Sequence, residues 1–204
     1  MKRLMSLVVV VLLGAVMFSS VNADAPIEGR EGRAELRFLE GMMDHHQMAL
    51  DMANDCLAES TSEEVKALCQ NIIDAQTAEI ATMKEWTLAW YNVDYAPMSM
   101  TDMDMGEMEG MDHSGMPGMP ATDPVMMMGM MAGLNRLEGV DYDFAWLESM
   151  IDHHDDAIHM SERLLLRVPE GVGHADLFAL ANQIIADQTA ETSIMEEMLT
   201  VMAS

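Results

Sequence analysis

Residues 39–46 read Leu-Glu-Gly-Met-Met-Asp-His-His, and residues 147–154 read Leu-Glu-Ser-Met-Ile-Asp-His-His. A second pair of segments also matches, because residues 72–79 and 184–191 differ only by an exchange of neighbouring Asp and Ala. Self-similarity of this kind is typical of a duplicated structural unit. The chain is therefore predicted to contain two copies of one unit.

Apolar residues recur with helical spacing around both copies. Each stripe advances by four and three residues in alternation, which is the spacing of a helix that packs in an antiparallel bundle. The first-helix stripes are Phe38, Met42, His45, Ala49, Met52 and Cys56 in one copy, and Trp146, Met150, His153, Ala157, Met160 and Leu164 in the other. A single hairpin cannot bury its stripes, whereas two facing hairpins can. The predicted fold class is all-α: an antiparallel four-helix bundle of two homologous helical hairpins with a Met-rich flexible linker.

Two helix starts are predicted from capping signals. The second helix is expected to be capped by Thr61 with Glu64, and the third helix by Asp141.

The N-terminal segment has the pattern of a signal peptide. Lys2 and Arg3 precede an apolar stretch and then small residues. The apolar stretch is shorter than the ~20 residues of a membrane-spanning helix. We therefore expect cleavage, export to the periplasm or the medium, and no stable membrane insertion afterwards. The predicted divisions are 1–23 signal peptide, 24–91 first hairpin, 92–140 Met-rich linker with a short helix, and 141–204 second hairpin.

Charge and composition exclude some classes of partner. The formal net charge is −25, with 10 Lys and Arg against 35 Asp and Glu. Nucleic-acid binding depends on basic patches, so it is excluded as a function. The chain has 26 Met but only 5% aromatic residues. Because Met specifies packing poorly, so large an excess predicts a use other than packing.

Cys56 and Cys69 flank the predicted turn of the first hairpin. In an exported protein they are expected to form a disulfide across that turn. A thiolate pair that binds a soft metal is the alternative.

Polar residues occupy stripe positions that a plain core fills with Leu or Ile. These residues are His45, Gln76 and Glu79, and in the second copy His153, Gln188 and Glu191. Buried polar groups need partners, so these side chains either bond one another or hold a ligand. The two Glu residues are expected to orient the His rings rather than to bind metal.

Thioether and imidazole groups share a helix face in both copies. Met42 lies three and four residues before His45 and His46, and Met83 follows on the next helix. The second copy repeats this arrangement with Met150, His153, His154 and Met195. This donor set favours Cu(I), with Ag(I) as a mimic and Cu(II) as a further candidate. Met48 and His159 are candidate ligands that are present in only one copy each.

The linker contains a separate set of candidate ligands. Its Met residues are two or three positions apart, and Met111, His113 and Met116 lie in the segment Met-Asp-His-Ser-Gly-Met. Such a segment can wrap one soft ion. The alternative is an acidic spacer whose Met residues have no role.

The pattern Met-x-Asp-His-His-x-x-Ala, followed by Ile-Ile-x-x-Gln-Thr-x-Glu-x-x-x-Met, resembles the ferritin-like DUF305 family, which includes periplasmic copper-binding members. The linker motif is similar to those of bacterial copper-resistance proteins. The resemblance implies a bundle that binds Cu(I) and Ag(I) through Met42, His45, His46, Met83 and their counterparts. The two copies of the pattern are not identical, because Asp155-Asp156 stands in the second copy where the first has Gln47-Met48. Unequal sites are therefore expected.

The predicted function is sequestration or carriage of copper in copper resistance and homeostasis, without enzymatic activity. Candidate exchange partners are another periplasmic copper protein or an efflux system. One alternative is a ferritin-like di-metal oxidase, but such sites use Glu-x-x-His motifs, which the chain lacks. A structural bundle that binds no metal is the other alternative, and it leaves the linker thioethers unexplained.

Overall fold

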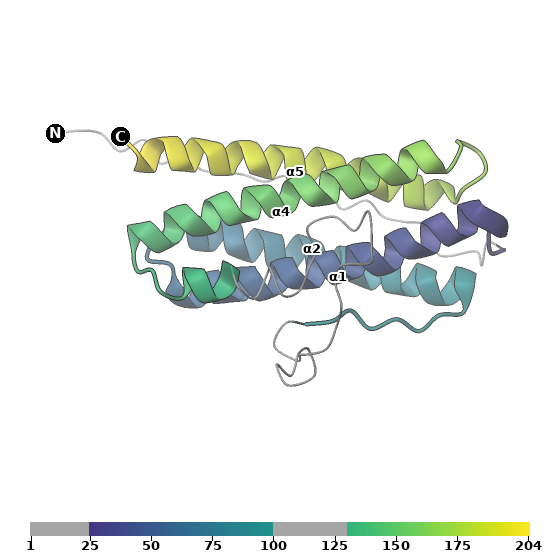
Figure 1. Ribbon diagram of the computed structural model, residues 1–204, viewed down its shortest axis with the longest axis horizontal. Coiled ribbons are helices and arrows are strands. Elements are labelled where there is room, and N and C mark those ends of the chain that lie inside the picture. The colour runs from purple at the N-terminus through teal and green to yellow at the C-terminus, as the bar shows by residue number, and fades with distance from the viewer. Residues whose placement is uncertain (1–24, 100–129) are drawn as a thin grey trace, which may run out of the picture.

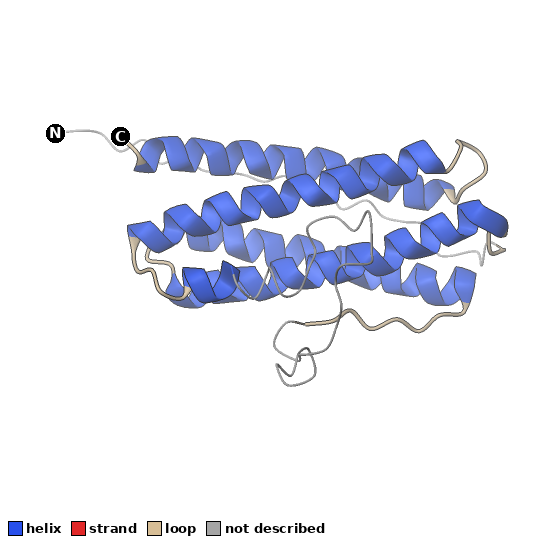
Figure 2. Ribbon diagram, viewed as in Figure 1, coloured by secondary structure: helices blue, strands red, loops and turns tan. Residues whose placement is uncertain are grey.

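The computed structural model describes residues 25–99 and 130–204, and these residues form helices and connecting loops (Figure 2). The helices are α1 (Gly29–Glu59), α2 (Glu63–Tyr91), α4 (Val140–Arg167) and α5 (Ala175–Met202). Residues 130–134 are also helical, within the predicted linker. The predicted signal peptide and most of the Met-rich linker lie outside the described residues.

Two helical hairpins pack together as an antiparallel four-helix bundle, which confirms the predicted fold class. In Figure 1, α1 and α2 form one hairpin, and α4 and α5 form the other. The chain leaves α2 at one end of the bundle and enters α4 at the opposite end, so the connection between these two helices joins opposite ends of the bundle. This crossover places α1 antiparallel to α4, and these two helices pack against each other. None of the helices within the described ranges combines the length and apolar character that a membrane crossing requires.

Two of the predicted helix starts are displaced by one or two residues. Ser62, not Thr61, caps α2, and its hydroxyl accepts a hydrogen bond from the backbone N–H of Val65. At α4 the cap is Gly139, with a φ of 59°, and Asp141 lies in the first turn. A glycine adopts this positive φ without a steric penalty. The helix therefore begins two residues earlier than the capping side chain of Asp141 predicted.

The core divides into two clusters along the bundle axis. The disulfide cluster contains Met48, Met52, Cys56, Cys69, Trp146, Met150 and Met195 among its buried members. The Trp86 cluster contains Phe38, Met42, Met83, Trp86, Trp90 and Leu164 among its members. In each cluster residues from both hairpins are buried together, so neither hairpin has a complete core without the other.

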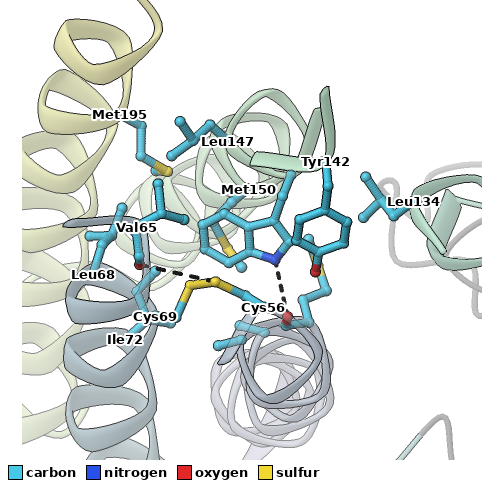
Figure 3. Close-up of a cluster of buried hydrophobic side chains, with 14 of the residues drawn as sticks. Cys56, Val65, Leu68, Cys69, Ile72, Leu134, Tyr142, Leu147, Met150 and Met195 are labelled. Carbon is cyan, nitrogen blue, oxygen red and sulfur yellow. Dashed lines mark hydrogen bonds between the residues drawn. A yellow bond between two sulfur atoms is a disulfide. The ribbon is translucent and has the colours of Figure 1, made fainter. Parts of the chain in front are cut away.

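The Cys56–Cys69 disulfide is present and closes the α1–α2 turn, with the two Cα atoms 6.4 Å apart. Figure 3 shows it among the apolar side chains of the disulfide cluster, beside Val65 and Ile72. The indole Nε1 of Trp146 donates to the backbone oxygen of Met52 at 3.0 Å, which joins α4 to α1 beside this cluster. Because both sulfurs are bonded to each other, neither serves as a thiolate ligand.

The described start of the linker lies along α1. The Tyr95 hydroxyl donates to Asp44 at 2.6 Å, and the backbone N–H of Met98 donates to the same carboxylate at 3.1 Å. The Ser99 hydroxyl bonds both carboxylate oxygens of Asp51, at 3.1 and 3.0 Å. Residues 92–99 are thus held against the helix that carries the first His-His pair.

Removal of the disulfide is expected to destabilise the protein without changing its fold. The bond joins residues 13 positions apart, and closing a loop of that size stabilises a protein by about 3 kcal/mol. C56A/C69A should lower the free energy of unfolding by about that amount, as measured by urea titration with circular dichroism. Dithiothreitol should lower the wild-type midpoint and leave the variant unchanged. An unchanged wild-type midpoint after verified reduction contradicts the prediction.

Candidate metal centre

The rings of His45 and His153 lie against each other at the centre of the bundle. His45 comes from α1 and His153 from α4, and their ring centroids are 3.7 Å apart with planes inclined by 40°. Both side chains are buried, with relative exposures of 0% and 3%. The spacing predicted that the first His of each pair lies in the core, and both are buried there. The structure also brings the two rings together, which the spacing alone did not predict.

The four ring nitrogens of His45 and His153 are buried, and none of them makes a hydrogen bond of normal geometry, although the backbone of each residue lies close enough to the other ring to oppose the effect of burial on its pKa. The side-chain amides of Gln76 and Gln188 are also buried without partners. A buried polar group left unpaired costs about 1–3 kcal/mol, and folded proteins rarely tolerate several together. The imidazoles of His45 and His153 and the amides of Gln76 and Gln188 are therefore the buried groups of the repeated helices that could hold a ligand.

Burial lowers the pKa of both central histidines well below the usual value. For His45 the neighbouring His153, His46 and His154 add to this effect, because a second positive charge nearby is unfavourable. For His153 the additional causes are His154 and His46. Both rings are therefore neutral at neutral pH, and each keeps a lone pair that can bind a metal ion.

The second His of each pair is held by a carboxylate on the neighbouring helix. His46 Nε2 lies 2.6 Å from Glu79 Oε2, and His154 Nε2 lies 2.7 Å from Glu191 Oε2. In both rings Nδ1 is buried and has no partner. When a neutral ring donates its Nε2 proton to the carboxylate, Nδ1 keeps its lone pair. This is the arrangement by which carboxylates orient His ligands in metal sites.

Thioether side chains lie in both core clusters. Met42 and Met83 are fully buried in the Trp86 cluster, whereas Met150 and Met195 are fully buried in the disulfide cluster. Each repeat thus keeps its own Met pair in one cluster. Figure 3 shows Met150 and Met195 on α4 and α5, among the apolar side chains near the disulfide. Met48 is buried in the same cluster as this second pair.

The remaining candidates do not join this buried set. His159 is exposed, and its Nδ1 donates to the backbone oxygen of Asp155 at 2.7 Å. Met111, His113 and Met116 lie outside the described residues. Within residues 25–99 and 130–204, no group of three or more His, Cys, Asp and Glu side chains is arranged to hold a metal ion. The buried thioethers are therefore the donors in this part of the protein that could complete a site around the imidazoles.

A second buried polar group was not predicted from the sequence. Glu35 is fully buried; it accepts from the His174 backbone N–H at 2.8 Å, lies 2.6 Å from His174 Nδ1, and accepts from the Tyr91 hydroxyl at 2.5 Å. The His174 ring stacks on Trp90, with centroids 3.8 Å apart. This group joins the start of α1, the end of α2 and the start of α5. One signal was available, because buried Asp143 occupies the position in the second copy that matches Glu35.

Comparison with known proteins gives a family match. The sequence pattern of one protein family, the domain of unknown function DUF305, matches residues 35–199. A DUF305 protein from Streptomyces coelicolor is 27% identical, with a TM-score of 0.62, and the match covers 84% of this chain and 93% of that one. A DUF305 fragment from Deinococcus radiodurans is 26% identical, with a TM-score of 0.60 and coverages of 82% and 95%.

CopM in its Cu(I)-bound form is also similar, at 26% identity and a TM-score of 0.59, with 81% of this chain and 95% of that chain covered. CopM has further been solved with Cu(II), with silver and in the apo form. No curated protein matches the sequence significantly.

The metal-free protein should lose stability as the pH falls from 7 to 5.5. His45 and His153 have lowered pKa values in the folded state, so the unfolded chain, with a His pKa of about 6.5, binds more protons in this range. Protons therefore favour unfolding, by about 1 kcal/mol per histidine over this interval. This loss of stability is absent well above the pKa of histidine in the unfolded chain and grows as the pH falls below that pKa.

Urea titrations at the two pH values test this expectation. H45L/H153L should show a flatter dependence of unfolding free energy on pH, because neither residue titrates. H159Q, at an exposed position, serves as the control and should follow the wild type. Parallel curves for H45L/H153L and the wild type contradict the prediction.

Proposed function

Because the chain belongs to the DUF305 family, to which residues 35–199 match, we propose that it binds Cu(I) through Met and His side chains inside its bundle. Copper is the cargo, which the protein sequesters or carries in copper resistance and homeostasis. Ag(I) acts as a mimic, and Cu(II) is a further candidate. The solved forms of CopM with Cu(I), Cu(II) and silver support this proposal.

The single observation that carries the proposal is the central pair of His45 and His153. Four imidazole nitrogens are buried without partners between two clusters that contain thioethers. Imidazole and thioether together form a soft to borderline donor set, which favours Cu(I) over hard cations. A neutral imidazole binds a metal through its unprotonated nitrogen, and a thioether carries no proton, so protons do not compete for these donors at neutral pH.

We propose two related but unequal bundle sites. Met42, His45, His46 and Met83 supply the first, and Met150, His153, His154 and Met195 supply the second. Their surroundings differ, because one Met pair lies beside Trp86 and the other near the disulfide. Met48 is buried with the second Met pair, so it belongs with that site although it comes from the first repeat.

The linker and the exposed surface supply the remaining proposed ligands. Met111, His113 and Met116 form a separate reservoir, and His159 is a surface ligand of the second hairpin. The start of the linker is held on α1 through Asp44 and Asp51, close in sequence to His45 and His46. Metal collected by the linker is therefore proposed to pass to the first site.

We propose that the protein is not an enzyme. A di-metal oxidase of the ferritin-like type needs several carboxylates at one centre. The stripe carboxylates here are Glu79 and Glu191, and each is bonded to a His ring. We also propose that the mature protein works outside the cytoplasm, since its disulfide is typical of oxidising compartments. A periplasmic copper protein or an efflux system is the proposed exchange partner.

Competition for Cu(I) tests the bundle sites. The mature protein is titrated with Cu(I) in the presence of a chromophoric Cu(I) chelator, under anaerobic conditions. H45L/H153L should weaken the tightest binding at least about tenfold, because it removes the central imidazoles. M198L/M202L, at two partly buried Met positions of the disulfide cluster, is the matched control and should bind as the wild type does. Failure of the wild type to compete with the chelator refutes the function.

Deletion of residues 98–119 tests the linker reservoir. The shortened protein should bind fewer Cu(I) ions per chain and retain the affinity of the tightest site, because the bundle ligands remain. Metal content after gel filtration gives the stoichiometry. An unchanged stoichiometry contradicts the reservoir and leaves the bundle sites unaffected.

A further inference from the structure

A groove between the start of α1 and the end of α4 is lined by five arginines. They are Arg30, Arg33 and Arg37 on α1, and Arg163 and Arg167 on α4. The whole chain has only 10 Lys and Arg against 35 Asp and Glu. Half of its cationic residues therefore face one groove, on a molecule that is otherwise strongly acidic.

These arginines have few carboxylate partners among the described residues. Arg30 lies 3.6 Å from Glu31, and this is the one ion pair within 4 Å that an arginine of the groove makes in residues 25–99 and 130–204. Four guanidinium groups therefore have no carboxylate within that distance in the described part of the chain. Arg163 also interacts with Asp156 of its own helix, where its charge opposes the burial that raises the pKa of that carboxyl group. Gathering five like charges with few carboxylates close to them is unfavourable, and the bundle core does not require it. The arrangement indicates a site for an anion that comes from outside the bundle.

The groove has a volume of about 770 Å³ and an apolar floor. Phe38, Leu164 and Met160 are among its apolar lining residues, and the first two are largely buried members of the Trp86 cluster. Leu166 adds an exposed apolar side chain at the edge, with a relative exposure of 86%. The volume is within the range of small-molecule pockets, and an apolar floor favours a ligand with an apolar body.

The arginines form two rows that limit the shape of the ligand. On α1 they are three and then four residues apart, so the row extends about 10 Å along the helix at 1.5 Å per residue. The two arginines of α4 form the opposite row. A guanidinium group binds carboxylate or phosphate by paired hydrogen bonds. An elongated molecule with anionic groups at separate points can reach more than one of these arginines at once.

We infer that this groove binds an organic anion with at least two carboxylate or phosphate groups on an apolar body. The anionic groups pair with arginines of both helices, and the apolar body lies on Phe38 and Leu164. Gly41 also lines the groove, where a Cβ atom would meet the Met160 methyl at 3.4 Å. The site is separate from the proposed copper ligands and does not depend on the proposed function.

Calorimetric titration of the full mature protein with dodecanedioate, at low salt, tests the inference. This probe has two carboxylates on an apolar chain and should bind with one-to-one stoichiometry. R33Q/R163Q, which removes one arginine from each row, should weaken binding about tenfold or more. K66Q/K84Q removes two cationic residues of α2 outside the groove and is the matched control, expected to bind as the wild type does. Equal urea midpoints for both variants verify that the fold is retained.

Three further probes define the ligand class. Inorganic phosphate and the neutral dodecanediol should bind much more weakly than dodecanedioate, because each lacks one of the two features. An alkane bisphosphate of the same length distinguishes phosphate from carboxylate preference. The inference is overturned by the absence of dodecanedioate binding, by equal loss in R33Q/R163Q and K66Q/K84Q, or by phosphate binding as tight as that of dodecanedioate.

Discussion

The adjacent, tilted rings of His45 and His153 place four nitrogen atoms without hydrogen bonds of normal geometry in an apolar interior. Each unpaired polar group costs about 1–3 kcal/mol there, so the rest of the bundle has to compensate for them. The compensation comes from apolar packing on both sides, in the disulfide cluster and the Trp86 cluster. The disulfide and the indole bond from Trp146 to Met52 hold one side, and the Glu35–His174 group holds the far end of the other.

Duplication explains why the polar groups meet at one level. Because α1 and α4 are antiparallel copies, the residues before His45 lie beside those after His153, and the reverse also holds. Each Met pair therefore lies on its own side of the His45 and His153 rings. The outer His residues follow the same symmetry, since His46 and His154 are held by Glu79 and Glu191 of their own hairpins. A copy of one hairpin thus supplied both halves of the centre.

The sequence was sufficient to predict the bundle, the facing hairpins and which His of each pair is central, because all of these depend on periodicity within one helix. Helix starts were less predictable: Ser62 and Gly139 act as caps where Thr61 and Asp141 also fit the local rule. The Glu35–His174 group and the arginine groove were missed because each joins segments that are distant in the chain. Arg33 and Arg163 become neighbours of one groove only when α1 is placed against α4.

The burial that makes the centre costly also makes its donors suitable for a soft cation. Water and protons are excluded, so the imidazoles remain neutral below the pH at which free histidine protonates. Thioethers carry no proton and, unlike Cys56 and Cys69, cannot be consumed by disulfide formation in an oxidising compartment. A ligand set of this kind keeps its donors available where thiolates are lost. A ligand that binds such nitrogens more tightly in the folded state than in the unfolded state offsets the cost of burying them and stabilises the fold.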